Sequence, residues 1–72
     1  MYNAEINVAG QVDEGWSDWL GGLEIQPTQA GETTLKGTIT DQSALYGIIA
    51  RLRDLGFKLN SIHVEAVNDL EY

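Results

Sequence analysis

The side chains with the most potential for chemistry lie near the C-terminal end of the sequence. His63 is the only histidine, and Ser61 and Glu65 lie two residues to either side of it, on the same face of a predicted strand. A hydroxyl, an imidazole and a carboxylate are the groups of a serine hydrolase, but that chemistry also needs a nucleophile turn, an oxyanion hole and a cleft. The chain has no nucleophile-elbow motif and only 72 residues. We therefore predict that the protein is not an enzyme and has no catalytic residue, with His63 on its surface.

Other site chemistries find equally little support in the sequence. Cysteine is absent, which rules out disulfides, thiolate zinc sites and a cysteine nucleophile. One imidazole among scattered carboxylates has no recognisable metal-ligand spacing. Gly21, Gly22 and Gly31 are not followed by the lysine and hydroxyl pair of a phosphate-binding loop. We predict no metal and no cofactor.

The charge of the chain limits its partners. Lys and Arg number 4 and Asp and Glu number 11, so the formal net charge at pH 7 is −7. This balance disfavours direct binding to nucleic acid or to an anionic membrane and suits a soluble protein or a partner of basic surfaces. An alternative is an acidic inhibitor that mimics nucleic acid, for which the chain offers one weak cluster of carboxylates: Asp13, Glu14, Asp18 and Glu24.

Hydropathy gives no sign of a membrane protein. No apolar run approaches the roughly 20 residues of a membrane-spanning helix. The N-terminal segment also lacks the basic and apolar regions of a signal peptide. We therefore predict a protein of the cytoplasm with no membrane association.

Four segments have the composition and alternation of β-strands: residues 2–8, 23–27, 33–40 and 58–67. Pro27 cannot donate a ladder hydrogen bond, so it places the second strand at a sheet edge. In the third strand Leu35, Gly37 and Ile39 are predicted to face inward. The alternation of the last strand slips near Asn60 and Ser61, which predicts a β-bulge there. Residues 68–72 are predicted to fray.

The strongest helix signal spans residues 42–55, where apolar residues recur at helical spacing. Thr40 or Asp41 is placed to cap its start, and Gly56 to end it in the left-handed conformation. A shorter helical turn is predicted over residues 13–22, capped by Asp13.

This order of elements predicts a ferredoxin-like α+β fold, an antiparallel sheet with helices on one face. The first and third strands would be central, and the second and fourth would be edges. If residues 13–22 form a loop, the fold becomes a four-stranded sheet with one helix. No linker or internal repeat interrupts the pattern, so we predict a single domain over residues 1–72.

Trp16 and Trp19 lie three residues apart and share one face of the predicted turn. One interpretation places both rings in the core, where they would close one half of a small sheet. The other exposes a ring as an interface anchor, because tryptophan is frequent among residues that dominate binding energies.

The side of the predicted helix that faces away from its apolar stripe carries mostly small residues: Ser43, Gly47, Ala50 and Asp54. A glycine in an exposed helix interior costs about 1 kcal/mol relative to alanine. Small side chains allow another backbone to approach closely, so we predict a contact with a second chain, flanked by Tyr46 and Arg53. The alternative is a solvated face. The outer sheet face is predicted to be polar and of mixed charge: Glu5, Asn7, Glu24, Gln26, Lys36, Thr38, His63 and Glu65.

Two stretches, residues 11–25 and 41–62, resemble a family of small uncharacterised bacterial proteins that carry a WSDWF-x-GL segment and a DQAALHGLL…RDLG segment. The resemblance covers most of the chain and implies a bacterial, cytoplasmic origin without an established activity. This sequence has Tyr46 where those proteins carry histidine and Leu20 where they carry phenylalanine.

Residues 33–67 are also similar, more weakly, to the first half of ACT-type small-molecule-sensing domains, which share the ferredoxin-like fold. That resemblance implies a ligand loop at Asp41, Gln42 and Ser43, although the usual proline-glycine pair is missing there. The sequence as a whole predicts a non-catalytic protein-interaction or assembly module that self-associates. The alternatives are a sensor of an amino-acid-like metabolite and the acidic inhibitor.

Overall fold

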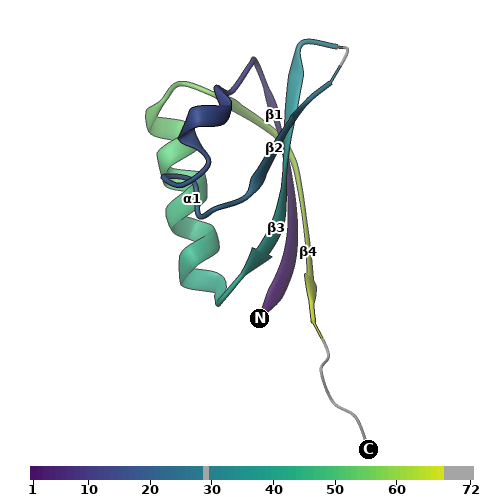
Figure 1. Cartoon of the computed structure of the whole chain (residues 1–72), viewed down its shortest axis with the longest axis vertical. Coiled ribbons are helices and arrows are strands. Elements are labelled where there is room, and N and C mark those ends of the chain that lie inside the picture. The colour runs from purple at the N-terminus through teal and green to yellow at the C-terminus, as the bar shows by residue number, and fades with distance from the viewer. Residues whose placement is uncertain (29, 68–72) are drawn as a thin grey trace, which may run out of the picture.

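The computed structural model describes residues 1–28 and 30–67, so the predicted fraying of residues 68–72 lies outside the described residues. The chain forms one four-stranded antiparallel sheet in the order β2-β3-β1-β4 (Figure 1). Its elements are β1 (Tyr2–Ala9), the 3-10 turn η1 (Glu14–Trp16), β2 (Glu24–Pro27), β3 (Glu32–Ile39), α1 (Gln42–Asp54) and β4 (Lys58–Ala66).

The strand order places β1 and β3 at the centre of the sheet and β2 and β4 at its edges, as the sequence predicted. The short β2 ends at Pro27, which has no N–H to offer a further neighbour. In the centre Ile6 lies opposite Leu35 on one side and Ile62 on the other.

The predicted bulge in β4 is present. Asn7 lies opposite Ser61 and Val8 lies opposite Leu59, so Asn60 is the extra residue. The Asn60 side-chain amide donates to Asn7 Oδ1 at 2.9 Å, which fixes the bulge to the neighbouring strand. The bulge returns Leu59 to the same face as Ile62.

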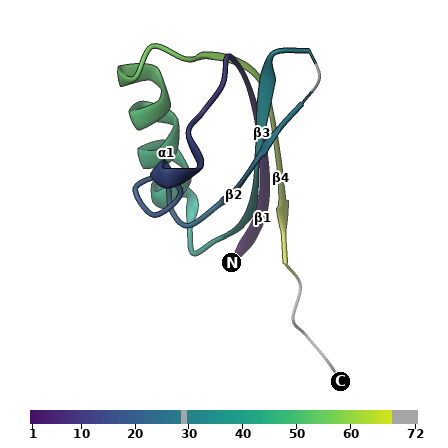
Figure 2. The same ribbon diagram turned by 45° about the horizontal axis from the view of Figure 1, so that its top comes forward.

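Helix α1 covers one face of the sheet and leaves the other open (Figure 2). Asp41 caps its start, because Asp41 Oδ1 accepts a hydrogen bond from the Ala44 N–H at 2.8 Å. At its other end Gly56 has φ +90°, the left-handed conformation predicted for it. Three residues of the predicted apolar stripe are buried on the sheet: Leu45, Ile48 and Leu52.

The predicted short helix over residues 13–22 does not form. The structure has only the three-residue turn η1 there, followed by turns that reach Gly22. A helix this short gains few hydrogen bonds for the residues it must order, and glycines at 15, 21 and 22 raise that entropic cost. The fold is therefore the predicted alternative, a four-stranded sheet with one α-helix.

The core lies between the covered sheet face and the layer made by α1 and residues 10–23, which we call the η1 loop. The buried hydrophobic side chains of this core are all aliphatic: Ala4, Ile6, Val8, Val12, Leu20, Leu23, Ile25, Leu35, Ile39, Leu45, Ile48 and Leu52. Thr33 is the one polar side chain fully buried among the described residues. Its Oγ1 donates to the Gly10 carbonyl at 2.7 Å and accepts from the Val12 N–H at 3.1 Å, so it ties the η1 loop to β3.

Candidate functional site

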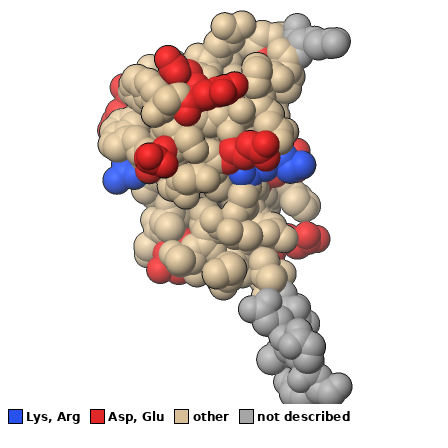
Figure 3. All heavy atoms as spheres, viewed as in Figure 1, with Lys and Arg blue, Asp and Glu red and all other residues tan. Residues whose placement is uncertain are grey.

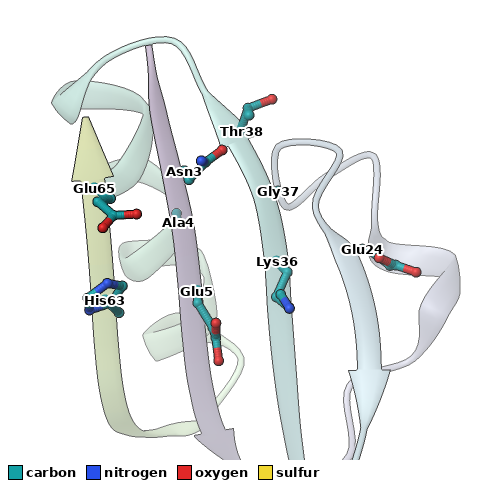
Figure 4. A pocket seen from close by; sticks show the side chains of 9 residues that line it. All are labelled: Asn3, Ala4, Glu5, Glu24, Lys36, Gly37, Thr38, His63 and Glu65. Carbon is teal, nitrogen blue, oxygen red and sulfur yellow. The ribbon is translucent and has the colours of Figure 1, made fainter. Parts of the chain in front are cut away.

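The residues that suggested hydrolase chemistry lie on the open face of the sheet. Figure 4 shows His63 and Glu65 on β4, beside Glu5 on β1. No hydrogen bond joins Ser61, His63 and Glu65 within the described part of the chain. Residues 1–28 and 30–67 also contain no group of three or more His, Asp or Glu side chains placed to hold a metal ion.

The open face is a shallow polar surface with alternating charges. Glu5 lies opposite His63 on one side and opposite Lys36 on the other, and Lys36 lies opposite Glu24. Acidic and basic side chains that alternate across neighbouring strands favour one another weakly in water. This row, together with Glu65, lines the hollow drawn in Figure 4, and its chemistry is that of a solvated sheet face.

The two tryptophans form a more distinctive surface on the helix side of the molecule. The Trp16 side chain is 38% exposed and the Trp19 side chain 46% exposed, so the interpretation that buries both rings in the core is wrong. The ring centroids are 5.4 Å apart with an interplanar angle of 76°, an edge-to-face arrangement. With Gly15 and Leu55 the rings line a shallow apolar hollow, and we call these four residues the tryptophan patch.

The rings face outward because smaller side chains already fill the inward positions of the η1 loop. Val12, Leu20 and Leu23 are buried from this loop, and the last two have no exposed surface. The part of the sheet that α1 leaves uncovered is small, and these aliphatic side chains close it. No room remains in the core for two indole rings.

Local hydrogen bonds hold the patch in place. Asp13 Oδ1 accepts from the Gly15 N–H at 2.8 Å and caps η1, while the Ser17 hydroxyl donates to the Leu23 carbonyl at 2.7 Å. From α1, Arg51 Nη1 donates to the Trp19 carbonyl at 2.7 Å. The Arg51 guanidinium also lies over the Trp19 ring, 5.4 Å from its centroid. The patch is thus connected to both the loop and the helix.

The small residues on one side of α1 do not all line the same surface. Ser43 and Gly47 line a groove with Thr38 and Thr40 at the end of β3, and a Cβ added at Gly47 would meet no atom within 4 Å. Ala50 is half-buried.

The residues predicted to flank this side are exposed. Tyr46 is 64% exposed, and Arg53 forms a surface ion pair with Asp54 at 3.6 Å. Such an exposed pair stabilises the fold little.

The three residues of the predicted ligand loop do not act together. The Asp41 carboxylate is engaged as the helix cap, and the Gln42 side chain is exposed to solvent. Ser43 alone lines the groove beside β3.

Two features of the structure escaped the sequence analysis. The buried Thr33 hydroxyl has no sequence signal beyond a threonine in a strand. The exposure of Leu59 and Ile62, 43% and 38%, was also not predicted, because only a slip of the alternation was recognised in this strand. The predicted bulge and the predicted edge position of the strand were the sequence signals that could have indicated this exposure.

The chain is thus a small α+β domain whose four-stranded sheet is covered on one face by one α-helix and a tryptophan-bearing loop. A family model described as a domain of unknown function, DUF8691, matches residues 3–63, and the chain belongs to this family. Both motif-bearing stretches, 11–25 and 41–62, lie within the matched residues. No curated protein and no solved structure matches the chain significantly. Among the described residues, no helix is long and apolar enough to cross a membrane.

Proposed function

We propose that the chain is a non-catalytic protein-interaction module of a bacterial cytoplasmic assembly and that the tryptophan patch binds its protein partner. One observation carries this proposal: two large aromatic rings, 38% and 46% exposed, lie edge to face on the surface of a 72-residue chain. Tryptophan is among the residues most enriched at the energetic centres of protein interfaces. An exposed pair is otherwise a liability, because it favours unspecific association.

The hydrogen bonds around the patch support the same function. Asp13 and Arg51 hold the segment that carries the rings before any partner arrives. A preformed surface loses less conformational entropy on binding than one that must first become ordered. The apolar hollow between Trp16, Trp19 and Leu55 is suited to one aliphatic or aromatic side chain of a partner.

The charges around the patch define the partner further. Asp13, Glu14 and Asp18 are exposed within the same loop and outnumber Arg51, the basic side chain that lies over the Trp19 ring. Figure 3 shows acidic side chains spread over this view of the molecule, whereas basic side chains form only small patches. Complementary charges speed association and disfavour wrong partners. The expected partner is a protein with an apolar anchor residue surrounded by Lys and Arg.

Affinity capture followed by titration tests this proposal. The wild-type chain, Trp16→Ala, Trp19→Ala and the control Tyr46→Ala are immobilised, and the proteins that each retains from a lysate of the native host are compared. A partner captured through the patch is retained by the wild type and by Tyr46→Ala and is lost from both tryptophan variants. In titrations with that purified partner we expect each tryptophan variant to bind roughly 30-fold more weakly. Equal affinities for the wild type and the tryptophan variants would refute the proposal.

Binding of a small amino-acid-like metabolite is a second candidate function. It is favoured by the groove of about 410 Å³ beside β3, which is lined by the hydroxyl-bearing Thr38, Thr40 and Ser43 and by the side-chain-free Gly47. Thermal unfolding in the presence of millimolar amino acids tests it, because a ligand that binds only the folded chain raises the midpoint. A stabilising ligand whose effect is lost in Ser43→Ala would support this function, and a panel without any shift would exclude it.

We propose that this fold derives from the ferredoxin-like fold by loss of most of the first helix. This proposal is supported by the central positions of β1 and β3 and by the antiparallel pairing of all neighbouring strands. In this derivation η1 replaces the first helix.

A further inference from the structure

Among residues 1–28 and 30–67, β4 has the longest strand edge without a neighbouring strand. β4 spans nine residues, Lys58–Ala66, and within this part of the chain it pairs with β1 on one side only. The opposite edge strand, β2, has four residues and ends in Pro27. An edge strand presents unpaired N–H and C=O groups to any strand that can lie beside it. β4 therefore offers the better edge for a further strand.

The covered face of β4 also leaves apolar surface exposed beside this edge. Leu59 and Ile62 lie opposite Val8 and Ile6, so their side chains point to the same face as the core. They are nevertheless 43% and 38% exposed, although α1 contacts β4 and Val64 packs against the core, so the edge strand is only partly covered. Polar side chains would normally occupy such positions on an edge that stays in solvent.

The order of side chains along β4 is complementary to itself. Lys58 lies opposite Ala9 of β1, and Glu65 lies opposite Asn3. The β1 residue midway between Ala9 and Asn3 is Ile6, and Ile62 lies opposite it. A second β4 placed antiparallel about a two-fold axis at Ile62 therefore brings Lys58 opposite Glu65 of the second copy, twice. Lys58 and Glu65 are both exposed on the open face of the sheet.

The same register matches the remaining side chains of the strand. On the covered face Ile62 meets Ile62 of the second copy, and Leu59 meets Val64. On the open face Ser61 meets His63. This match depends on the bulge at Asn60, because without the extra residue Leu59 and Lys58 would change faces. A parallel arrangement would instead place Lys58 beside Lys58 and Glu65 beside Glu65.

From this complementarity we infer that two copies of the chain associate through β4 and form one continuous eight-stranded sheet. The inference deepens the assembly role proposed above and uses a surface separate from the tryptophan patch. The described part of β4 carries Lys58, His63 and Glu65, so this edge is close to neutral in a chain of net charge −7. The second copy therefore meets little local repulsion there.

Helix α1 contacts β4 on the covered face of the sheet. The side of α1 with Gly47 and Arg51 lines the groove at the end of β3, and Tyr46 and Ile49 lie on the other side of the helix. Tyr46 is 64% exposed in the single chain, and a second copy across the two-fold axis would bring another α1 to the same face of the sheet. One strand edge with few apolar side chains makes a small interface, so the expected dimer is weak and depends on concentration.

Charge reversal at the two ends of β4 tests this arrangement. The masses of the full chain and of Lys58→Glu, Glu65→Lys and K58E/E65K are measured by sedimentation from about 1 to about 500 µM, a range suited to a small interface. Each single reversal replaces two attractive pairs by two repulsive ones and should weaken the dimer roughly tenfold. The double variant exchanges the charges at positions 58 and 65, so each pair is attractive again. It should restore dimerisation to within about threefold of the wild type.

Several outcomes would overturn the inference. A wild-type chain that remains monomeric over the whole range refutes it, as does a dimer that either single reversal leaves unchanged or that the double variant fails to restore. Binding of β4 by a strand of another protein would appear as a monomer that forms a complex sensitive to Lys58→Glu, and this too contradicts a homodimer. Far-UV circular dichroism verifies that each variant is folded. Trp19→Ala should leave the dimer intact, which separates this test from that of the tryptophan patch.

Discussion

The buried Thr33 hydroxyl provides the sharpest test of how the η1 loop is attached to the sheet. We consider Thr33→Val, a change that preserves the shape of the side chain and its preference for strands. It removes two hydrogen bonds: the one that Oγ1 donates to the Gly10 carbonyl, at 2.7 Å, and the one that Oγ1 accepts from the Val12 N–H, at 3.1 Å. Thr33 has 0% exposed surface, so water cannot replace the hydroxyl without moving the strand or the loop.

The magnitude follows from the burial of the two abandoned groups. The Val12 N–H belongs to a buried bond, and a buried donor without a partner costs about 1–3 kcal/mol. The Gly10 carbonyl belongs to a partly buried bond, for which the loss is about 0.5–1.5 kcal/mol. The sum is about 1.5–4.5 kcal/mol, a large share of the roughly 4–11 kcal/mol expected for a domain of this length. The corresponding fall in the thermal midpoint is roughly 10–30 °C, at about 6–7 °C per kcal/mol for a chain of 72 residues.

Urea unfolding and thermal unfolding measure this loss, with the two tryptophans as fluorescence reporters and far-UV circular dichroism as a second signal. Thr33→Ser is the matched control, because it keeps the hydroxyl and removes only a methyl group, at about 1 kcal/mol. We expect the valine variant to be clearly less stable than the serine variant. A valine variant as stable as the wild type, or more stable than the serine variant, would refute the reasoning.

Three further substitutions test the helix and the sheet. Gly47→Ala should raise the free energy of unfolding by about 1 kcal/mol, because the added Cβ meets no atom within 4 Å and alanine favours helix; an unchanged or lower stability in urea unfolding would contradict this. Gly37→Ala should lower it by about 1–3 kcal/mol, because its Cβ would lie 2.8 Å from Leu23 Cδ2 in the core, and a neutral result in the same assay would show that Leu23 moves freely. Asp41→Ala removes the bond from the Ala44 N–H and should cost about 1 kcal/mol, with Asp41→Asn, which can still cap, close to the wild type in thermal unfolding.

The sequence determined the elements whose signals are local. The alternation of residues 2–8 predicted β1, and Asp41 and Gly56 marked the two ends of α1. Pro27 predicted an edge strand, and the slip near Asn60 predicted the bulge, since both depend on backbone chemistry within a few residues. These features follow from periodicity, capping and hydrogen-bonding capacity, which the chain carries wherever it folds.

Only the tertiary structure decided what each apolar side chain does. It turned Trp16 and Trp19 outward because the aliphatic residues of the η1 loop fill the small area that α1 leaves uncovered. It left Leu59 and Ile62 half exposed because β4 is an edge strand that α1 covers only in part. Whether a hydrophobic side chain is buried depends on which surface lies above it, and that is a property of the packed layers rather than of local sequence.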